Sequence, residues 1–246
     1  MSVLIGGGSG FVGANLIALL KRNGVSSRII SRRSGLENSI TWVGKKIAGD
    51  EFQENFANQI VKEGIPENVE HVVNLAGAPL ADFTKNWQKG YKKEVFDSRI
   101  ETTKILAEAI GRKTPGSKLK TFVQTSAVGY YPYSDTVEYT EDSHVTEELG
   151  NIFVKLCKEW EAAGELPETR RDVRRLIFRF ELSFFAGRPC CLGTPSFVVK
   201  CIFDPDRAEM ALKGQKVVPK RTLESGFRFQ YPKIDQACDA IIYKCI

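Results

Sequence analysis

Residues 1–16 read MSVLIGGGSGFVGANL, and this stretch decides the fold. The apolar run Val3–Ile5 is typical of a buried strand, and from Phe11 onward apolar residues recur at helical spacing. The turn between them fits two spacings: G-x-G-x-x-G at Gly8, Gly10 and Gly13, and G-x-x-G-x-x-G at Gly7, Gly10 and Gly13. Because glycine is costly to hold in one conformation, such a cluster indicates a turn that needs glycine.

This pattern is typical of a dinucleotide site at a strand-to-helix turn. The first glycine permits a tight turn, the second lets a pyrophosphate approach the backbone, and the third allows close packing of helix and strand. The helix N-terminus then offers free N–H groups to the phosphates. Here an amphipathic helix with Leu16, Leu19 and Leu20 follows the glycines, and a second strand, 28–30, comes next. The stretch therefore predicts a dinucleotide site rather than an ordinary glycine turn.

The composition is that of an ordinary globular protein. The 246 residues are 42% apolar and 26% charged, which suits one large domain or one domain with a small appendage. The net charge of +5 comes without a long basic run, so no nucleic-acid partner is predicted. No apolar stretch is long enough to cross a membrane and no signal peptide is recognisable, so we expect a cytoplasmic protein with no membrane partner.

Cysteine and histidine usage limits the metal and redox chemistry. None of the six cysteines forms a C-x-x-C motif, so free thiols in a reducing compartment are expected. The chain has only two histidines, His71 and His144, which argues against a histidine-rich metal site. No metal site is predicted.

Strand and helix patterns alternate up to about residue 178. Strands with their following loops are expected at 71–77, 119–131 and 171–180, and helices at 86–111 and 147–164. One face of the first helix is expected to be buried through Phe96, Ile100, Thr103, Ala107 and Ile110. The alternation predicts an α/β protein with a Rossmann-type, doubly wound parallel sheet. Ligands bind at the carboxyl ends of such strands, where residues 7–13, 74–77 and 125–131 fall.

The residues after the second strand indicate which dinucleotide binds. NAD sites usually place an acidic residue about twenty positions beyond the glycines. Here Ser31, Arg32 and Arg33 stand at the strand end, and the first acidic residue, Glu37, comes too late. Because a guanidinium pairs well with a phosphate, we expect NADP, with Ser31 and Arg32 at the 2′-phosphate. The alternative is a pair of solvated surface arginines.

Several motifs together resemble one family. They are GGGSGFVG, ISRR, NLAGAPL, NWQKGYKKEVFDSRIETTKILAEAI, TSAVGYY and FVKLCKEWEAA, and their order resembles that in the atypical, epimerase-like branch of the extended short-chain dehydrogenase/reductases. The tail, 195–235, is similar to the small C-terminal module of that branch. The resemblance implies an NADP-dependent oxidoreductase. It also implies cofactor contacts at Gly7, Gly10, Phe11, Val12, Gly13, Ser31, Arg32, Leu75, Ala76, Glu94 and Arg99.

The chain departs from the superfamily at its catalytic motif. Short-chain reductases use a Tyr-x-x-x-Lys pair in which the tyrosine exchanges a proton with the substrate oxygen. No such pair exists here, because the matching helix carries Phe153 and Cys157 at the two positions. Ser126 matches the catalytic serine of the superfamily, and Tyr130 or Tyr131 is the candidate acid.

A second departure is a missing internal segment. The family continues for several tens of residues after RRDVRRLIF, whereas here residues 179–194 form a bridge that resembles nothing in the family. We therefore expect a Rossmann domain at 1–178, the atypical bridge at 179–194, and a truncated C-terminal module at 195–246. Splicing, an internal deletion and a gene-model error are the alternative origins.

Three functions remain open at this point. The first is a reductase or epimerase-like enzyme acting on a small hydroxyl or carbonyl substrate of unknown identity. The second is a non-catalytic module that binds or senses NADP(H), which the missing motif favours. The third is an inactive truncated isoform. In the tail, Phe227, Phe229 and Tyr231 alternate like one face of a short strand, so we expect them to pack rather than to bind nucleic acid. The oligomeric state is not predicted.

Overall fold

The structure is a computed structural model. It describes residues 1–31, 39–41, 60, 64–80, 85, 87, 89–112, 116–146, 151–180, 196–233, 235–237 and 239–240. The described chain forms two compact units, the first comprising Met1–Tyr130 and Gly150–Gly193, the second Tyr131–Leu149 and Thr194–Ile246.

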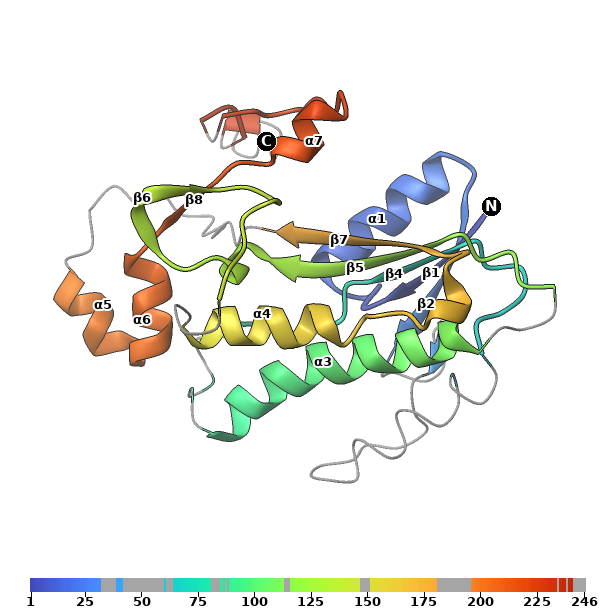
Figure 1. Cartoon of the computed structure of the whole chain (residues 1–246), viewed down its shortest axis with the longest axis horizontal. Coiled ribbons are helices and arrows are strands. Elements are labelled where there is room, and N and C mark those ends of the chain that lie inside the picture. The colour runs from blue at the N-terminus through green and yellow to red at the C-terminus, as the bar shows by residue number, and fades with distance from the viewer. Residues whose placement is uncertain are drawn as a thin grey trace. The chain divides into compact units, whose positions relative to one another are not determined.

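The first unit is built on a parallel sheet of six strands in the order β3-β2-β1-β4-β5-β7 (Figure 1). The strands are β1 (Ser2–Gly6), β2 (Ser26–Ser31), β3 (Ser39–Thr41), β4 (His71–Asn74), β5 (Thr121–Ala127) and β7 (Arg174–Phe180). Every neighbouring pair runs parallel. This strand order is that of a Rossmann fold, so the predicted fold class is confirmed.

Helices cover both faces of this sheet. Figure 1 shows α1 (Phe11–Arg22) on one face, and α3 (Lys89–Gly111) and α4 (Ile152–Ala162) together on the other. Asn151 caps α4, since its side chain accepts hydrogen bonds from the backbone N–H groups of Phe153 and Val154. Two short 3₁₀ turns, η1 (Val128–Tyr130) and η3 (Glu168–Arg170), also belong to the unit.

The core lies between the sheet and the α3 side. Its buried apolar residues come from four strands, from α3 and from the connecting segments, and they are Leu4, Ile30, Ile60, Ile65, Val69, Val72, Ile105, Leu106, Ala109, Ile110, Leu119, Phe122 and Val173. Burial of such side chains is the main driving force for docking helix on sheet.

The buried faces of two helices differ from the sequence expectation. On α3 three of the five predicted residues are buried as expected, namely Thr103, Ala107 and Ile110, whereas Phe96 and Ile100 are only half-buried. Val95, Thr102 and Leu106 are buried as well. The face that meets the core is therefore rotated slightly from the predicted one. On α1 the only fully buried residue is Gly13, and Leu19 is 55% exposed. The apolar stripe of α1 is thus poorly covered by the described residues.

The register of the sheet brings the predicted motifs to one edge. Gly6 at the end of β1 lies beside Ile30 on β2 and Asn74 on β4. On the far side, Ser126 of β5 lies beside Arg179 of β7. As expected, the glycine turn, the turn after Asn74 and the end of β5 all occupy the carboxyl ends of the strands.

The second unit contains a two-stranded parallel sheet of β6 (Ser134–Tyr139) and β8 (Gln215–Val217). Its helices are α5 (Ser196–Ile202), α6 (Pro205–Leu212) and α7 (Lys220–Glu224). The expectation that Phe227, Phe229 and Tyr231 pack as a strand is wrong: they form no strand, and they are 55%, 43% and 37% exposed. Their segment follows α7 without the partner strand that such a pattern requires.

Two features that would point to other functions do not occur in the described ranges. No described helix combines the length and apolar character needed to cross a bilayer. Nor do His, Cys, Asp and Glu side chains gather there in a group that could hold a metal ion.

Candidate functional site

The turn from β1 into α1 depends on glycine at its first position. Gly7 has a φ of +73°, which L-residues with side chains rarely adopt. A β-carbon there would also lie 2.7 Å from the backbone of Leu75 and Ala76, in the turn that follows β4. Gly7 therefore allows the two loops to touch, and the observed turn supports the predicted dinucleotide motif.

The two later glycines differ in what surrounds them. At Gly13 a β-carbon would lie 2.6 Å from the carbonyl oxygen of Gly7, so this glycine lets α1 pack against the turn. At Gly10 the nearest atom would be 3.3 Å away, again the Gly7 oxygen. Since Gly10 has little protein around it and an ordinary φ of −79°, its missing side chain leaves space outside the protein. That is the space into which a pyrophosphate would fit.

The N-terminus of α1 is open to a phosphate group. Gly10 precedes the helix without a side-chain cap, and the first turn holds no acidic residue. Phe11 and Val12 are 81% and 54% exposed, which is unusual for apolar side chains. Free N–H groups, the positive dipole end and an exposed apolar rim together suit an anionic, partly apolar ligand.

A buried asparagine shapes the neighbouring turn. The Asn74 side-chain oxygen accepts a hydrogen bond from the Ala76 N–H at 3.1 Å, and its amide donates to Thr103 Oγ1 at 2.8 Å. Leu75 N–H donates to the Gly6 carbonyl at 2.8 Å. Leu75 and Ala76, both predicted cofactor contacts, are thus held directly beside the glycine turn.

Of the remaining predicted cofactor residues, one ends β2, two lie on α3 and one is not described. Ser31 ends β2, and Arg32 lies outside the described residues. Glu94 is exposed on α3 and forms an ion pair with Lys85 at 3.3 Å. Arg99 lies five residues further along α3, where it is partly buried and packs against Gly77.

The two positions of the absent catalytic motif are filled by buried side chains. Phe153 and Cys157 are 6% and 2% exposed on the face of α4 that meets β5 and η1. Burial, together with the nearby Glu161 carboxylate, raises the pKa of the Cys157 thiol to about 12. At neutral pH this thiol is therefore protonated and unreactive, and it cannot replace the lysine cation.

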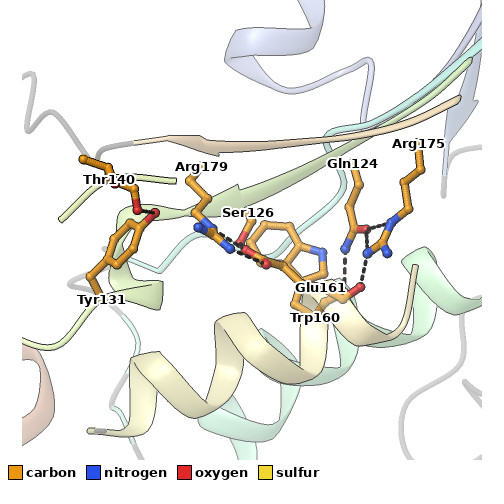
Figure 2. A network of polar contacts seen from close by, with 8 residues as sticks. All are labelled: Gln124, Ser126, Tyr131, Thr140, Trp160, Glu161, Arg175 and Arg179. Atoms are coloured by element: carbon orange, nitrogen blue, oxygen red, sulfur yellow. Dashed lines mark hydrogen bonds and ion pairs between the residues drawn. The ribbon is translucent and has the colours of Figure 1, made fainter. Parts of the chain in front are cut away.

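Ser126 takes part in a buried polar network that links three elements (Figure 2). Its hydroxyl donates to Glu161 Oε1 at 2.7 Å. Arg179 on β7 holds the same carboxylate with two hydrogen bonds, both 2.8 Å long. Ser126 is 3% exposed and Glu161 8%. The serine proton is thus directed at a carboxylate, and the serine oxygen retains only acceptor capacity for any further partner.

A second set of contacts joins β7 to the end of α4. Arg175 donates to Gln124 Oε1 at 2.8 Å and to the Glu161 carbonyl. Gln124 donates to the Trp160 carbonyl at 2.5 Å (Figure 2). These bonds satisfy carbonyl groups in the last turn of the helix. They fix the height of α4 over β5, and with it the position of Glu161 beneath Ser126.

The two candidate tyrosines fall in different units. Tyr130 belongs to the first unit, where the Arg179 guanidinium lies 3.6 Å from its ring centroid. Tyr131 belongs to the second unit, where it is 1% exposed and its hydroxyl donates to the Thr140 carbonyl at 2.9 Å. Ser126 and Tyr130 are therefore connected through Arg179. The role of either tyrosine as an acid stays a prediction.

Sequence reasoning missed Glu161 and Arg179, although both left a signal. Glu161 follows Phe153 by eight residues and Cys157 by four, so it shares their helix face. Arg175 and Arg179 are separated by an even number along one strand, so they share a sheet face. Two arginines on a face covered by a helix require acceptors on that helix.

The fold and the glycine turn define a Rossmann-type protein, in which Gly7, Gly10 and Gly13 form a cradle at the start of α1. The model of the NAD dependent epimerase/dehydratase family matches residues 3–161, and that of a domain of unknown function, DUF1731, matches residues 194–241. The chain belongs to the NAD dependent epimerase/dehydratase family, which confirms the resemblance noted from the motifs.

Two relatives share its particular branch. The epimerase family protein SDR39U1 of Bos taurus is 31% identical over 314 positions, which cover 98% of this chain and all of the bovine protein. The crystal structure of human epimerase family protein SDR39U1 (isoform2) with NADPH is similar with a TM-score of 0.79 and 28% identity, covering 96% of this chain and 97% of that one. A nucleoside-diphosphate sugar epimerase from Corynebacterium glutamicum, 21% identical, shares the fold with a TM-score of 0.65 over 98% of this chain and 57% of its own.

This chain is shorter than the bovine protein with which it aligns. The alignment runs over 314 positions, more than the 246 residues of this chain, so the bovine protein has residues without a counterpart here. The two family matches leave residues 162–193 between them. That interval contains β7, whose arginines hold Glu161.

Proposed function

We propose that this protein is an NADP-dependent oxidoreductase or epimerase-like protein acting on a small hydroxyl or carbonyl substrate. The observation that carries the proposal is the cradle at Gly7, Gly10 and Gly13, which opens onto the uncapped N-terminus of α1. The human relative that was crystallised with NADPH supports the choice of cofactor.

The residues of the cradle fit such a cofactor. The backbone N–H groups of Phe11 and Val12 would bind the pyrophosphate, and Leu75 and Ala76 would line its path along the sheet edge. Ser31 and Arg32 would meet the 2′-phosphate, on the sequence argument above. When bound, the nicotinamide supplies or accepts a hydride, while the chain binds and orients it.

The test is a fluorescence titration with NADPH and with NADH. We expect NADPH to bind more tightly by about tenfold to hundredfold, because one charge-assisted contact is worth about 1.5–3 kcal/mol. Arg32→Ala should reduce the difference, and Arg28→Ala, which removes a guanidinium elsewhere on β2, should leave it unchanged. Equal affinity of the wild-type protein for both cofactors would refute the NADP assignment.

A second function, NADP(H) binding without turnover, is favoured by the side chains at the candidate catalytic positions. Phe153 has no proton to exchange, and the hydroxyls of Ser126 and Tyr131 donate to internal acceptors. Oxidation of NADPH in the presence of a panel of aldehydes, ketones and quinones separates the two functions. Turnover of any of these substrates excludes the binding-only function, whereas tight binding without turnover of any of them supports it.

A further inference from the structure

Arg99 on α3 lies at the inner edge of the cradle. A β-carbon at Gly77 would lie 3.2 Å from its Cζ atom, so its guanidinium packs directly against the turn that follows β4. Nη1 donates to the Val95 carbonyl at 3.0 Å, and Cζ lies 5.4 Å from the centre of the Trp160 ring. The side chain is thus fixed from three sides.

The positive charge of Arg99 has no carboxylate partner among the described residues, in contrast to that of Arg179, which is paired with Glu161. Burial lowers the pKa of the Arg99 guanidinium to about 10. The side chain is therefore still a cation at neutral pH. A partly buried cation that no carboxylate of the described residues neutralises projects its field onto a ligand in the adjoining space.

This charge lies on the nicotinamide side of the predicted site. A dinucleotide crosses a doubly wound sheet at the switch point between its two halves, with one nucleotide on each side. The adenine half is assigned to β2 by Ser31, so the nicotinamide half falls towards β4 and β5. Arg99 lies between Gly77, after β4, and the Trp160 ring on α4. The same helix carries Cys157 at the position of the absent catalytic lysine, so Arg99 brings a cation to α4 from another helix.

We propose that Arg99 makes the site select reduced over oxidised NADP. The two forms differ in the nicotinamide ring, which is neutral in NADPH and carries a positive charge in NADP⁺. A fixed cation beside this ring disfavours only the oxidised form, while its attraction for the phosphates is common to both. The inference rests on the proposed NADP(H) binding, and it adds which redox form the protein holds.

The experiment measures dissociation constants for NADPH and NADP⁺ by calorimetry on the full chain. We expect the wild-type protein to bind NADPH about tenfold more tightly, the size of effect that two like charges produce at intermediate range in a partly solvated site. Arg99→Met and Arg99→Gln should bring the two constants to within about twofold of each other. Arg99→Lys should retain the preference, because it retains the charge.

Lys104→Met is the matched control, since it removes an exposed positive charge from the same helix. It should leave the ratio of the two constants unchanged. Equal constants in the wild-type protein, or an undiminished ratio in Arg99→Met or Arg99→Gln, would overturn the inference while the proposed function stands. Absence of binding of both forms would overturn the proposed function and this inference with it.

Discussion

Gly10 and Gly13 are three residues apart, yet a side chain would meet different surroundings at each. At Gly13 it would collide with the backbone of the turn, whereas at Gly10 its only protein neighbour within 4 Å would be the Gly7 carbonyl oxygen, at 3.3 Å. The same residue type thus has two purposes within one motif. Gly13 allows the protein to pack, and Gly10 allows a ligand to approach.

Substitution of the two glycines by valine should separate these purposes. Gly10→Val should change the free energy of unfolding by only about 1 kcal/mol, the cost of a poor N-cap residue, yet abolish NADPH binding. Gly13→Val should cost about 3 kcal/mol or more, because the turn has no room for the side chain. Chemical denaturation and calorimetry measure the two effects. Normal NADPH binding by Gly10→Val would show that the loop is only a turn.

At the scale of elements, α4 and β7 are joined by the pair of Glu161 and Arg179. The two side chains are 11% and 20% exposed, so neither charge is well solvated without the other. The exposed pair of Lys155 and Glu159, on the outer side of α4, provides a contrast at 70% and 46% exposure. Burial should decide which pair contributes to stability.

A double-mutant cycle tests this difference. Glu161→Gln and Arg179→Met should each lower the free energy of unfolding by about 2–4 kcal/mol. The first leaves the Arg179 cation without its carboxylate, and the second leaves the Glu161 carboxylate without its cation. The double variant should lose about 1–3 kcal/mol less free energy of unfolding than the two single variants lose together. The same cycle at Lys155 and Glu159 should give a coupling of about 0.5 kcal/mol or less. Additive effects at Glu161 and Arg179 would show that the buried pair contributes no coupling.

Most elements of the first unit were predictable from the sequence, whereas their partners and the elements of the second unit were not. Periodicity located β1, β4, β5, β7 and the two long helices, because local spacing determines which face is apolar. The pairing of Glu161 with Arg179 depends on the register of β7 on β5 and on the height of α4, and neither is local. The buried face of α3 was predicted correctly at Thr103, Ala107 and Ile110, and misplaced nearer the start of the helix for a related reason. Phe96 and Ile100 fit the period, but Val95 is buried there instead.

At the scale of the whole molecule, β7 is the outermost described strand beyond β5. Phe178 and Phe180 project from one of its faces, 47% and 50% exposed, with their rings 6.3 Å apart. The other face carries Arg175 and Arg179, which are bonded to α4. An edge strand with an aromatic face is prone to associate with other chains.

We therefore expect this chain to self-associate as its concentration rises. Phe178→Lys and Phe180→Lys should each reduce the apparent mass in light scattering after gel filtration, because a charge on the exposed face opposes association. Val137→Lys, an exposed apolar position on β6 in the second unit, is the control and should change nothing. A monomeric wild-type protein at all concentrations would contradict this expectation.

The separation of Glu161 from its arginine also matters while the chain is being made. Arg179 follows Glu161 by 18 residues, which at about 5–20 residues per second takes about 1–4 s to synthesise. During that interval α4 has left the ribosome without the strand that neutralises its carboxylate. The first unit is finished only when β7 emerges, and the second waits longer still, because its segments lie on either side of residues 150–193. Each nascent chain thus passes through a stage in which Glu161 on α4 has been made but its partner Arg179 on β7 has not.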